Sequence, residues 1–175
     1  GSGGAEFAFQ RLVEKGCILF GLQRVHSIAR IKEYGKSVYM LGRKRELQIG
    51  AIPAKESLPI SYILTNLFGI RCKALPNYLS VTLTPSNPIL HTTRLYTMFK
   101  DYNEERMYPR NILFYEEWDD ESSKNLIDCD DELQVLCDRI PMPLESVQSL
   151  RNYYESFTIP AMTGKIKSIK AFRGM

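Results

Sequence analysis

Pro53 marks a change in the spacing of apolar residues, and this change constrains the fold more than any other feature of the chain. Between Val25 and Ile52 apolar and polar residues alternate in steps of two, as they do in β-strands, and Gly35 and Gly42 are placed for turns. After Pro53 the apolar residues follow the 3.6-residue period of helices. The sequence therefore predicts an α+β protein with a basic β-meander before Pro53 and helices after it.

The first 20 residues have the order helix, glycine, buried strand that is typical of an α/β sheet. Ala5–Lys15 has a rough helical pattern, Gly16 is placed to end that helix, and Cys17–Phe20 is a short apolar run. One such unit cannot cover both faces of a sheet. We therefore expect residues 1–53 to be the remainder of a larger domain.

The segment after Pro53 predicts helices separated by prolines and turns. Ser57 is placed to cap a helix that Gly69 ends. For the next helix, Ser86 or Asn87 is the expected cap and Pro88 the first helical residue. The other predicted segments are an extended piece at 70–75, helical stretches at 78–84 and 111–118, and two short helices near the C-terminus.

The longest predicted helix begins at Asp119 or Asp120 and continues to residue 140. One apolar stripe follows the helical period, and its members are Leu126, Cys129, Leu133, Leu136, Cys137 and Ile140. The acidic residues of this helix, including Asp130, fall largely outside the stripe. We expect them to form a solvated face and not a metal site.

Charge is distributed unevenly along the chain. Residues 11–55 carry ten basic and three acidic side chains, whereas residues 100–145 carry five basic and fourteen acidic ones. A basic stretch suits a nucleotide phosphate, an anionic substrate or a solvated hairpin as well as a nucleic acid. No zinc finger, helix-turn-helix or RNP-like aromatic run accompanies it, so we expect no nucleic-acid partner.

Several protein classes are excluded by what the sequence lacks. No apolar run approaches the roughly 18 residues that a membrane-spanning helix needs, and no secretory signal pattern opens the chain. The four cysteines form no C-x-x-C pair of the kind that zinc sites and redox motifs use. We expect a cytoplasmic protein with reduced thiols, no bound metal and no membrane partner.

The chain has two histidines, and they differ in their surroundings. His26 stands beside Arg24 at the entrance to the predicted meander and is interpreted as structural. His91 lies in the first turn of the helix that Pro88 opens, where unpaired amides favour anions and disfavour an imidazolium. A neutral imidazole there could act as a general acid or base on a carboxylate-bearing substrate. A histidine packed between helices explains the same position equally well.

The segment from Ser86 to His91, followed by an apolar helix, resembles the Asn-x-x-x-His segment of the octopine/nopaline (opine) dehydrogenase family. Three other segments resemble that family in the same order along the chain. They are Gly3-Gly4-Ala5-Glu6-Phe7, the run Phe20–Val25 with the basic meander behind it, and Ile169–Met175. The resemblance covers essentially the whole chain, and its specificity comes from the order and spacing of short motifs.

The resemblance implies a fold and a reaction. Residues 1–53 would be the C-terminal part of a Rossmann-type nucleotide-binding domain, and residues 54–175 a mostly α-helical, 6-phosphogluconate-dehydrogenase-like domain that is incomplete at its C-terminus. Such enzymes condense an amino acid with a 2-oxo acid and reduce the imine with NADH or NADPH. The resemblance also allows a homodimer formed through the helical domain.

The same resemblance implies roles for individual residues. His91 would be the proton donor and acceptor. Arg24, Asn87 and Thr92 would lie on the substrate side, although a hairpin arginine at the surface explains Arg24 as well. Gly3 and Gly4 would lie on the cofactor side.

This chain departs from the family's pattern in three places. It has no G-x-G-x-x-G pyrophosphate cradle, it ends at Met175 before the Asp that the family pairs with its His, and Thr92 stands where the family commonly has Pro. We therefore expect a fragment that is inactive alone. Two alternatives remain. One is a non-catalytic helical dimerisation or interaction module. The other is a 2-hydroxy-acid or ketopantoate-type reductase, whose helical lobe carries a catalytic Lys, but the His91 helix has none before Lys100.

Overall fold

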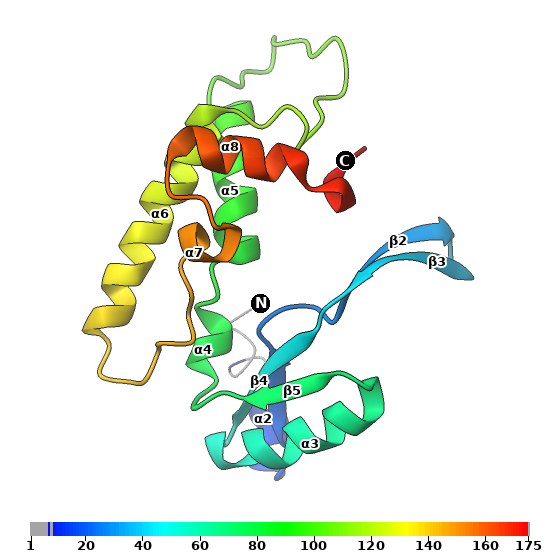
Figure 1. The fold of residues 1–175 in the computed structure, drawn as a ribbon, viewed down its shortest axis with the longest axis vertical. Coiled ribbons are helices and arrows are strands. Elements are labelled where there is room, and N and C mark those ends of the chain that lie inside the picture. The colour runs from blue at the N-terminus through cyan, green and yellow to red at the C-terminus, as the bar shows by residue number, and fades with distance from the viewer. Residues whose placement is uncertain (1–6, 8, 175) are drawn as a thin grey trace. The chain divides into compact units, whose positions relative to one another are not determined.

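The computed structural model describes residue 7 and residues 9–174, and the chain forms two compact units. Unit 1 combines Gly1–Thr84 with Met142–Val147, and unit 2 combines Pro85–Pro141 with Gln148–Met175. The architecture is mixed, with small sheets in unit 1 and helices in unit 2 (Figure 1). The functional division between residues 53 and 54 stays a prediction.

A three-stranded sheet in the order β1-β4-β5 forms the centre of unit 1. Strand β1 (Leu19–Leu22) runs antiparallel to β4 (Glu46–Ile52), and β5 (Arg71–Ala74) runs parallel to β4. Because parallel neighbours need a crossover, helix α3 (Ser57–Phe68) connects β4 to β5 and packs on them, after a short 3-10 turn η1 (Ala54–Glu56). The predicted extended piece at 70–75 is thus a strand of this sheet.

Helix α3 ends as predicted but begins differently. Gly69 has a φ of +62° and closes the helix in the left-handed conformation that favours glycine. Ser57 does not cap the helix, because its buried Oγ accepts the Ala51 amide at 2.9 Å. Aliphatic side chains from α3 and the sheet make a core of Leu47, Ile49, Ala51, Ile60, Leu64, Ile70 and Cys72.

The sheet face opposite this core is closed by a tight backbone contact. A Cβ placed on Gly50 would lie 2.8 Å from the carbonyl oxygen of Asn77, so only glycine fits there. Asn77 accepts the Ser80 amide at 2.9 Å and so opens the short helix α4 (Leu79–Thr82). Its Nδ2 donates to the carbonyl of Pro143 at 2.8 Å, which attaches the returning segment 142–147 to unit 1.

The predicted three-stranded meander is wrong in its pairing. Strands β2 (Ser27–Glu33) and β3 (Ser37–Arg43) form a separate antiparallel hairpin, while β4 pairs with β1 and β5. Every residue of β3 is exposed. The two-residue period predicts strands correctly here, but it carries no information on which strands pair. Before the hairpin, helix α2 (Gln10–Glu14) is followed by Gly16 with a φ of +80°.

Unit 2 is built on helices α5 (Ser86–Phe99), α6 (Asp120–Arg139) and α8 (Ile159–Ser168). Helix α6 packs against both α5 and α8, and α7 (Leu150–Tyr154) contacts α6 and α8 (Figure 1). A final 3-10 turn, η2 (Lys170–Phe172), ends the described chain. The buried core of the unit consists of Leu90, Tyr115, Trp118, Leu126, Ile127, Leu150, Tyr154, Met162 and Ile166.

The start of α6 agrees with the prediction, but its buried face does not. Asp119 caps the helix, with Oδ1 accepting the Ser122 amide at 2.7 Å. Of the predicted stripe only Leu126 is buried, and Leu136 is 47% exposed. The residues that α6 buries are Ser122, Ser123, Leu126, Ile127 and Asp130. Asp130, expected on the solvated face, is fully buried.

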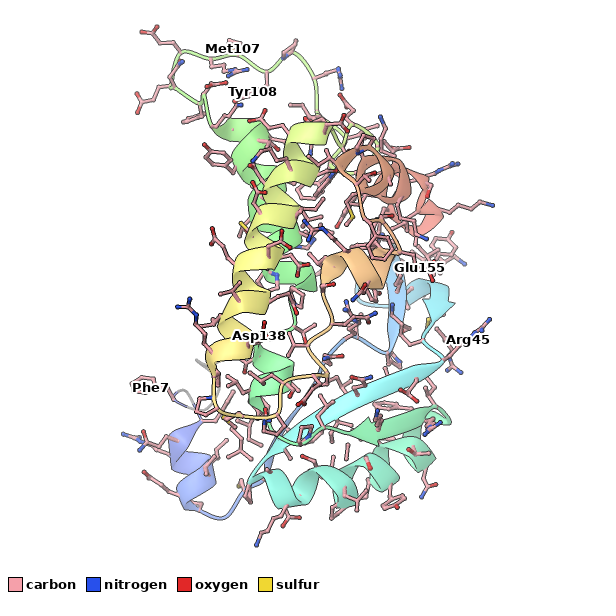
Figure 2. All side chains as sticks on the ribbon, turned by 60° about the vertical axis from the view of Figure 1, so that its left-hand side comes forward. Phe7, Arg45, Met107, Tyr108, Asp138 and Glu155 are labelled. Carbon is pink, nitrogen blue, oxygen red and sulfur yellow. The ribbon has the colours of Figure 1, made fainter. Side chains whose placement is uncertain are left out.

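A long loop connects α5 to α6, and in place of the helix predicted at 111–118 only residues 114–117 form a turn. Met107 and Tyr108 lie at the far end of this loop (Figure 2), where Met107 is 86% exposed. The loop then returns to α5, where Tyr115 contacts His91, and the carbonyls of Phe114 and Glu117 accept from Arg94. Among the described residues, no helix combines the length and apolar character needed to cross a membrane.

Candidate active site

His91 lies on the exposed side of α5, where its ring contacts two aromatic residues of the returning loop. Its Nε2 is 3.0 Å from the hydroxyl of Tyr115, and its ring meets that of Phe114 edge-on with centroids 5.6 Å apart. The imidazole is therefore open to solvent and not sealed in a core. An exposed imidazole that has a defined partner can exchange a proton with a bound molecule.

Tyr115 is the buried half of this pair. It is only 8% exposed, and its ring stacks on Phe172 with centroids 4.2 Å apart and an interplanar angle of 21°. Its ring also lies parallel to that of Trp118, with ring centroids 6.4 Å apart. A tyrosine packed in this way has few alternative rotamers, so its hydroxyl is held where the His91 ring can reach it.

Arg94 fixes the loop segment that carries Tyr115. Its guanidinium is 3% exposed and lies 5.7 Å from the Trp118 ring. Its donors reach four acceptors, which are the carbonyls of Phe114 (3.0 Å) and Glu117 (2.7 Å), Asp119 Oδ2 (3.1 Å) and Ser122 Oγ (3.0 Å). Five donors in a rigid fork suit this geometry, which a lysine could not reproduce.

Sequence reasoning missed Arg94, although one signal was available. Leu90 is buried, and Arg94 follows it by four residues, so both lie on the same helical face. An arginine on the apolar face of a helix must find acceptors, because an unpaired buried charge is costly. Counting apolar residues alone treats such an arginine as a break in the stripe.

The exposed end of the same loop is held by a second arginine. Arg110 binds Glu117 through two hydrogen bonds of 2.7 Å, and the Leu113 amide donates to Glu117 Oε1 at 2.8 Å. The hydrogen bond from Arg110, followed by that from the Leu113 amide, lowers the pKa of Glu117 to about 2. The segment before Tyr115 is thus anchored at its surface as well as in the core.

The prediction that His91 lies in the first turn of its helix, where the field of the helix terminus is strong, is wrong. Helix α5 begins two residues earlier than predicted, with Pro85 as its N-cap, so His91 is the sixth helical residue and lies in the second turn. Of the four positions whose amides lack an intrahelical acceptor, 85 and 88 are prolines without an N–H. Since the helix field falls off within the first turn, it adds little at His91.

The other predicted site residues are placed as follows. Thr92 is exposed, and its hydroxyl donates within its own helix to the carbonyls of Pro88 and Ile89. Asn87 is in α5, but its side chain lies outside the described structure, as do Gly3 and Gly4. Arg24 is half-buried between β1 and β2 in unit 1. The roles expected for all of them stay predictions.

His26, interpreted as structural, is half-buried in unit 1. Its Nδ1 lies 3.0 Å from Ser27 Oγ, and its ring is tilted against Phe68 with centroids 5.3 Å apart. Both contacts are with residues of the surrounding fold. They give His26 an ordinary packing role.

The described residues contain no cluster of metal-ligating side chains, and the two thiols of α6 are less acidic than usual. Among them, no three His, Cys, Asp or Glu side chains gather as metal ligands would. Burial, assisted by neighbouring carboxylates, raises the pKa of the Cys129 and Cys137 thiols. The exposed imidazole of His91 is therefore the group with the clearest capacity for chemistry in unit 2.

Known proteins agree with the resemblance seen in the sequence. Residues 74–175 match the family described as NAD/NADP octopine/nopaline dehydrogenase, alpha-helical domain. That segment is more than half of the chain and contains His91, Arg94 and Tyr115. No curated protein sequence gives a significant match.

Three solved structures of octopine dehydrogenase share the fold. They are the NADH complexes with L-arginine (19% identity, TM-score 0.69), with pyruvate (19%, 0.68) and with agmatine (20%, 0.66). Each match covers 90% of this chain but only 42%, 41% and 42% of the octopine dehydrogenase chain, respectively. The chain thus spans about two fifths of those proteins. From the family match over residues 74–175, the chain belongs to the NAD/NADP octopine/nopaline dehydrogenase family.

Proposed function

We propose that this chain is the substrate-side part of an NAD(P)-dependent opine dehydrogenase, which condenses an amino acid with a 2-oxo acid and reduces the resulting imine. The observation that carries the proposal is an exposed imidazole, His91, within the segment that matches the family. The structural neighbours are complexes of NADH with L-arginine, pyruvate or agmatine, which supports this substrate class.

The residues of this chain do not suit a pyrophosphate-binding role. The sequence contains no G-x-G-x-x-G turn, and the pair Gly3-Gly4 lies outside the described residues. We therefore assign the dinucleotide mainly to a separate nucleotide-binding half, to which residues 1–53 would belong, and the substrate to residues 54–175. On this assignment the 175-residue chain alone is inactive, and the complete enzyme is cytoplasmic.

His91 would transfer the proton of the reaction. When bound, NADH or NADPH supplies a hydride to the imine carbon. The imine nitrogen must then carry a proton, and the exposed ring of His91 can deliver it and later regain one from water. Arg24, Asn87 and Thr92 are the proposed substrate-side residues. General acid–base catalysis of this kind contributes about 10²–10⁴ to a rate.

The reductase alternative requires a catalytic lysine in the helical unit, and the contacts of the lysine at the end of α5 do not favour that role. The first lysine after His91 is Lys100, at the end of α5, where it pairs with Glu121. Its hydrogen bond with Glu121 raises the pKa of Lys100, which favours a fixed charge over proton transfer. The non-catalytic alternative is separated from the proposal by experiment.

The test is the turnover of the full-length enzyme, measured by NADH oxidation with pyruvate and L-arginine. We expect His91→Ala to lower kcat at least ~100-fold while the Kd for NADH changes little. His26→Ala is the matched control, since it removes the other histidine of the chain, and it should keep kcat within about twofold. Near-normal turnover of His91→Ala would exclude His91 from the mechanism. No NADH oxidation with any amino acid and 2-oxo acid would favour the non-catalytic module.

A further inference from the structure

Helix α3 is apolar on both of its sides. Its inner side packs on the sheet of β4 and β5, where Ile60 and Leu64 are buried (Figure 1). None of its 12 residues is charged. A helix that is apolar all round is typical of a buried position, because the exposed side of a helix normally carries charged and polar side chains. The outer side of α3 therefore has the composition of a covered surface.

The outer side of α3 presents six exposed residues over three helical turns. These residues, which we call the α3 face, are Leu58, Pro59, Tyr62, Ile63, Asn66 and Leu67. Four of them are large and apolar, and their exposed fractions are 54% for Leu58, 64% for Tyr62, 62% for Ile63 and 71% for Leu67. Contiguous exposed apolar surface of this kind marks a site of interaction.

The exposed sides of α6 and α8 have a different composition. On α6, Lys124 and Asp128 form an ion pair in solvent, and α8 carries Lys165 and Lys167 in its last turn. Charged side chains of this kind keep the surface of a helix hydrated. The lack of charge on the α3 face is therefore a property of this helix and not of the helices of the chain in general.

The position of the α3 face restricts what can cover it. Further strands and helices of the same α/β domain would be added at the edges of the sheet, beside α3, and would leave its outer side uncovered. A membrane-binding helix carries Lys and Arg around its apolar side chains, and α3 has neither. A second α3 face has the matching apolar composition, and a two-fold axis brings identical surfaces together.

The exposed area also suits an interface between two copies. A side chain of this size has about 150–200 Å² of surface, so the four apolar residues together expose roughly 400–500 Å². Two copies packed on these faces would remove about 1,000 Å² from water, which is the lower limit for a specific interface. The expected dimer is therefore reversible, with a dissociation constant in the micromolar range.

We propose that the α3 face is the interface of a homodimer, in which two α3 helices pack antiparallel across a two-fold axis with Tyr62 near the centre. Antiparallel packing places the N-terminus of each helix beside the C-terminus of the other, so the helix dipoles attract. Tyrosine is among the residues that contribute most to binding at the centre of an interface. This dimer does not depend on the proposed function, and it differs from the helical-domain dimer that the family resemblance allows.

The test is sedimentation velocity of the full-length enzyme over a range of micromolar concentrations, in which the wild type should form dimers. Tyr62→Lys places two charges at the centre of each dimer, so it should weaken dimerisation at least ~100-fold. Leu67→Lys, at the C-terminal end of the same face, is a second variant and should weaken it in the same way. Because both side chains are exposed, the variants should keep the wild-type circular dichroism spectrum.

The same substitution at two similarly exposed tyrosines is the control. Tyr96→Lys on α5 tests the helical unit, and Tyr39→Lys on β3 tests the hairpin, where these side chains are 61% and 54% exposed. Both controls should remain dimeric. A wild type that is monomeric at every concentration would overturn the proposal, and so would a dimer that a folded α3 variant leaves intact or that either control dissociates. None of these results bears on His91, because turnover is measured separately.

Discussion

Two charged side chains, Arg94 and Asp130, are buried among the described residues of unit 2, and they differ in how completely they are hydrogen-bonded. Near the candidate site, Arg94 is 3% exposed and has four hydrogen-bond acceptors. Asp130 of α6 is fully buried, and its Oδ2 accepts the Leu150 amide at the start of α7 at 2.7 Å. Among the described residues no donor reaches its Oδ1 with hydrogen-bond geometry, although the side chain of Gln134 is near enough to lower its pKa slightly against the effect of burial. A fully satisfied charge can hold a site rigid, whereas a half-satisfied one lowers stability.

The largest loss of stability is expected when Arg94, the fully hydrogen-bonded buried charge, is removed. Arg94→Met should lower the free energy of unfolding by about 3–5 kcal/mol, because it leaves buried acceptors and Asp119 without their donor. Arg94→Lys should recover only part of the loss, since an ammonium cannot reproduce the fork. The measurement is urea unfolding followed by circular dichroism.

The control for Arg94 is an arginine with the same kind of partner at the surface. Arg110 binds Glu117 in a bidentate pair but is 63% exposed, so Arg110→Met should cost far less. Equal losses for the two variants would show that burial of the guanidinium does not matter.

Both buried charges also show where prediction from the sequence fails. Local signals are predicted well: Gly69 ends α3, and Asp119 caps α6, because each depends only on residues within one turn. Arg94 and Asp130 depend on acceptors and donors 20 to 28 positions away, from Phe114 to Ser122 and at Leu150. A prediction from helical periodicity assigns apolar residues to the buried face and charged residues to the exposed face. It therefore predicts the wrong buried face for α6, where Asp130 is buried.

The sequence fails to predict the strand pairing and the residues around His91 for the same reason, because both depend on contacts between distant segments. The meander between residues 25 and 52 is read correctly as strands, but β4 leaves its chain neighbour β3 to pair with β1 and β5. The pairing of β4 with β1 and β5 builds the apolar core that the sheet shares with α3. Alternation of residues along one strand does not encode which strands pair. Likewise the sequence singles out His91 but gives no sign of Tyr115, which reaches it only through the fold of a 20-residue connection.

A smaller effect of opposite sign is expected at the half-satisfied charge. Burial raises the pKa of Asp130 above its usual value, so the folded protein binds this proton more readily than the unfolded chain. The stability that the protonated form provides is therefore lost as pH rises from the ordinary Asp pKa through the raised one. Asp130→Asn keeps an oxygen for the Leu150 amide and removes the charge.

We therefore expect Asp130→Asn to raise the free energy of unfolding by about 1 kcal/mol at neutral pH, with the gain disappearing at acidic pH. Urea unfolding at a series of pH values measures both. Asp128→Asn on the exposed face of α6 is the matched control and should remove only the surface pair with Lys124. A destabilised Asp130→Asn with the wild-type pH slope would mean that the Oδ1 of Asp130 is not the unsatisfied group.

The smallest effect on stability is expected for Glu117 in the loop between α5 and α6, because solvent screens its ion pair with Arg110. The Arg110 hydrogen bonds and the Leu113 amide hold the pKa of Glu117 at about 2, below its usual value, so its stabilising contribution is present at neutral pH and is lost as pH falls from the ordinary Glu pKa towards 2. Glu117→Gln should unfold at a slightly lower urea concentration than the wild type at neutral pH, and the two should converge on acidification. Glu104→Gln, at an exposed position of the same loop, should show no such convergence. If Glu117→Gln instead lost as much stability as Arg94→Met, exposure would not be what separates a weak charge pair from a strong one in this loop.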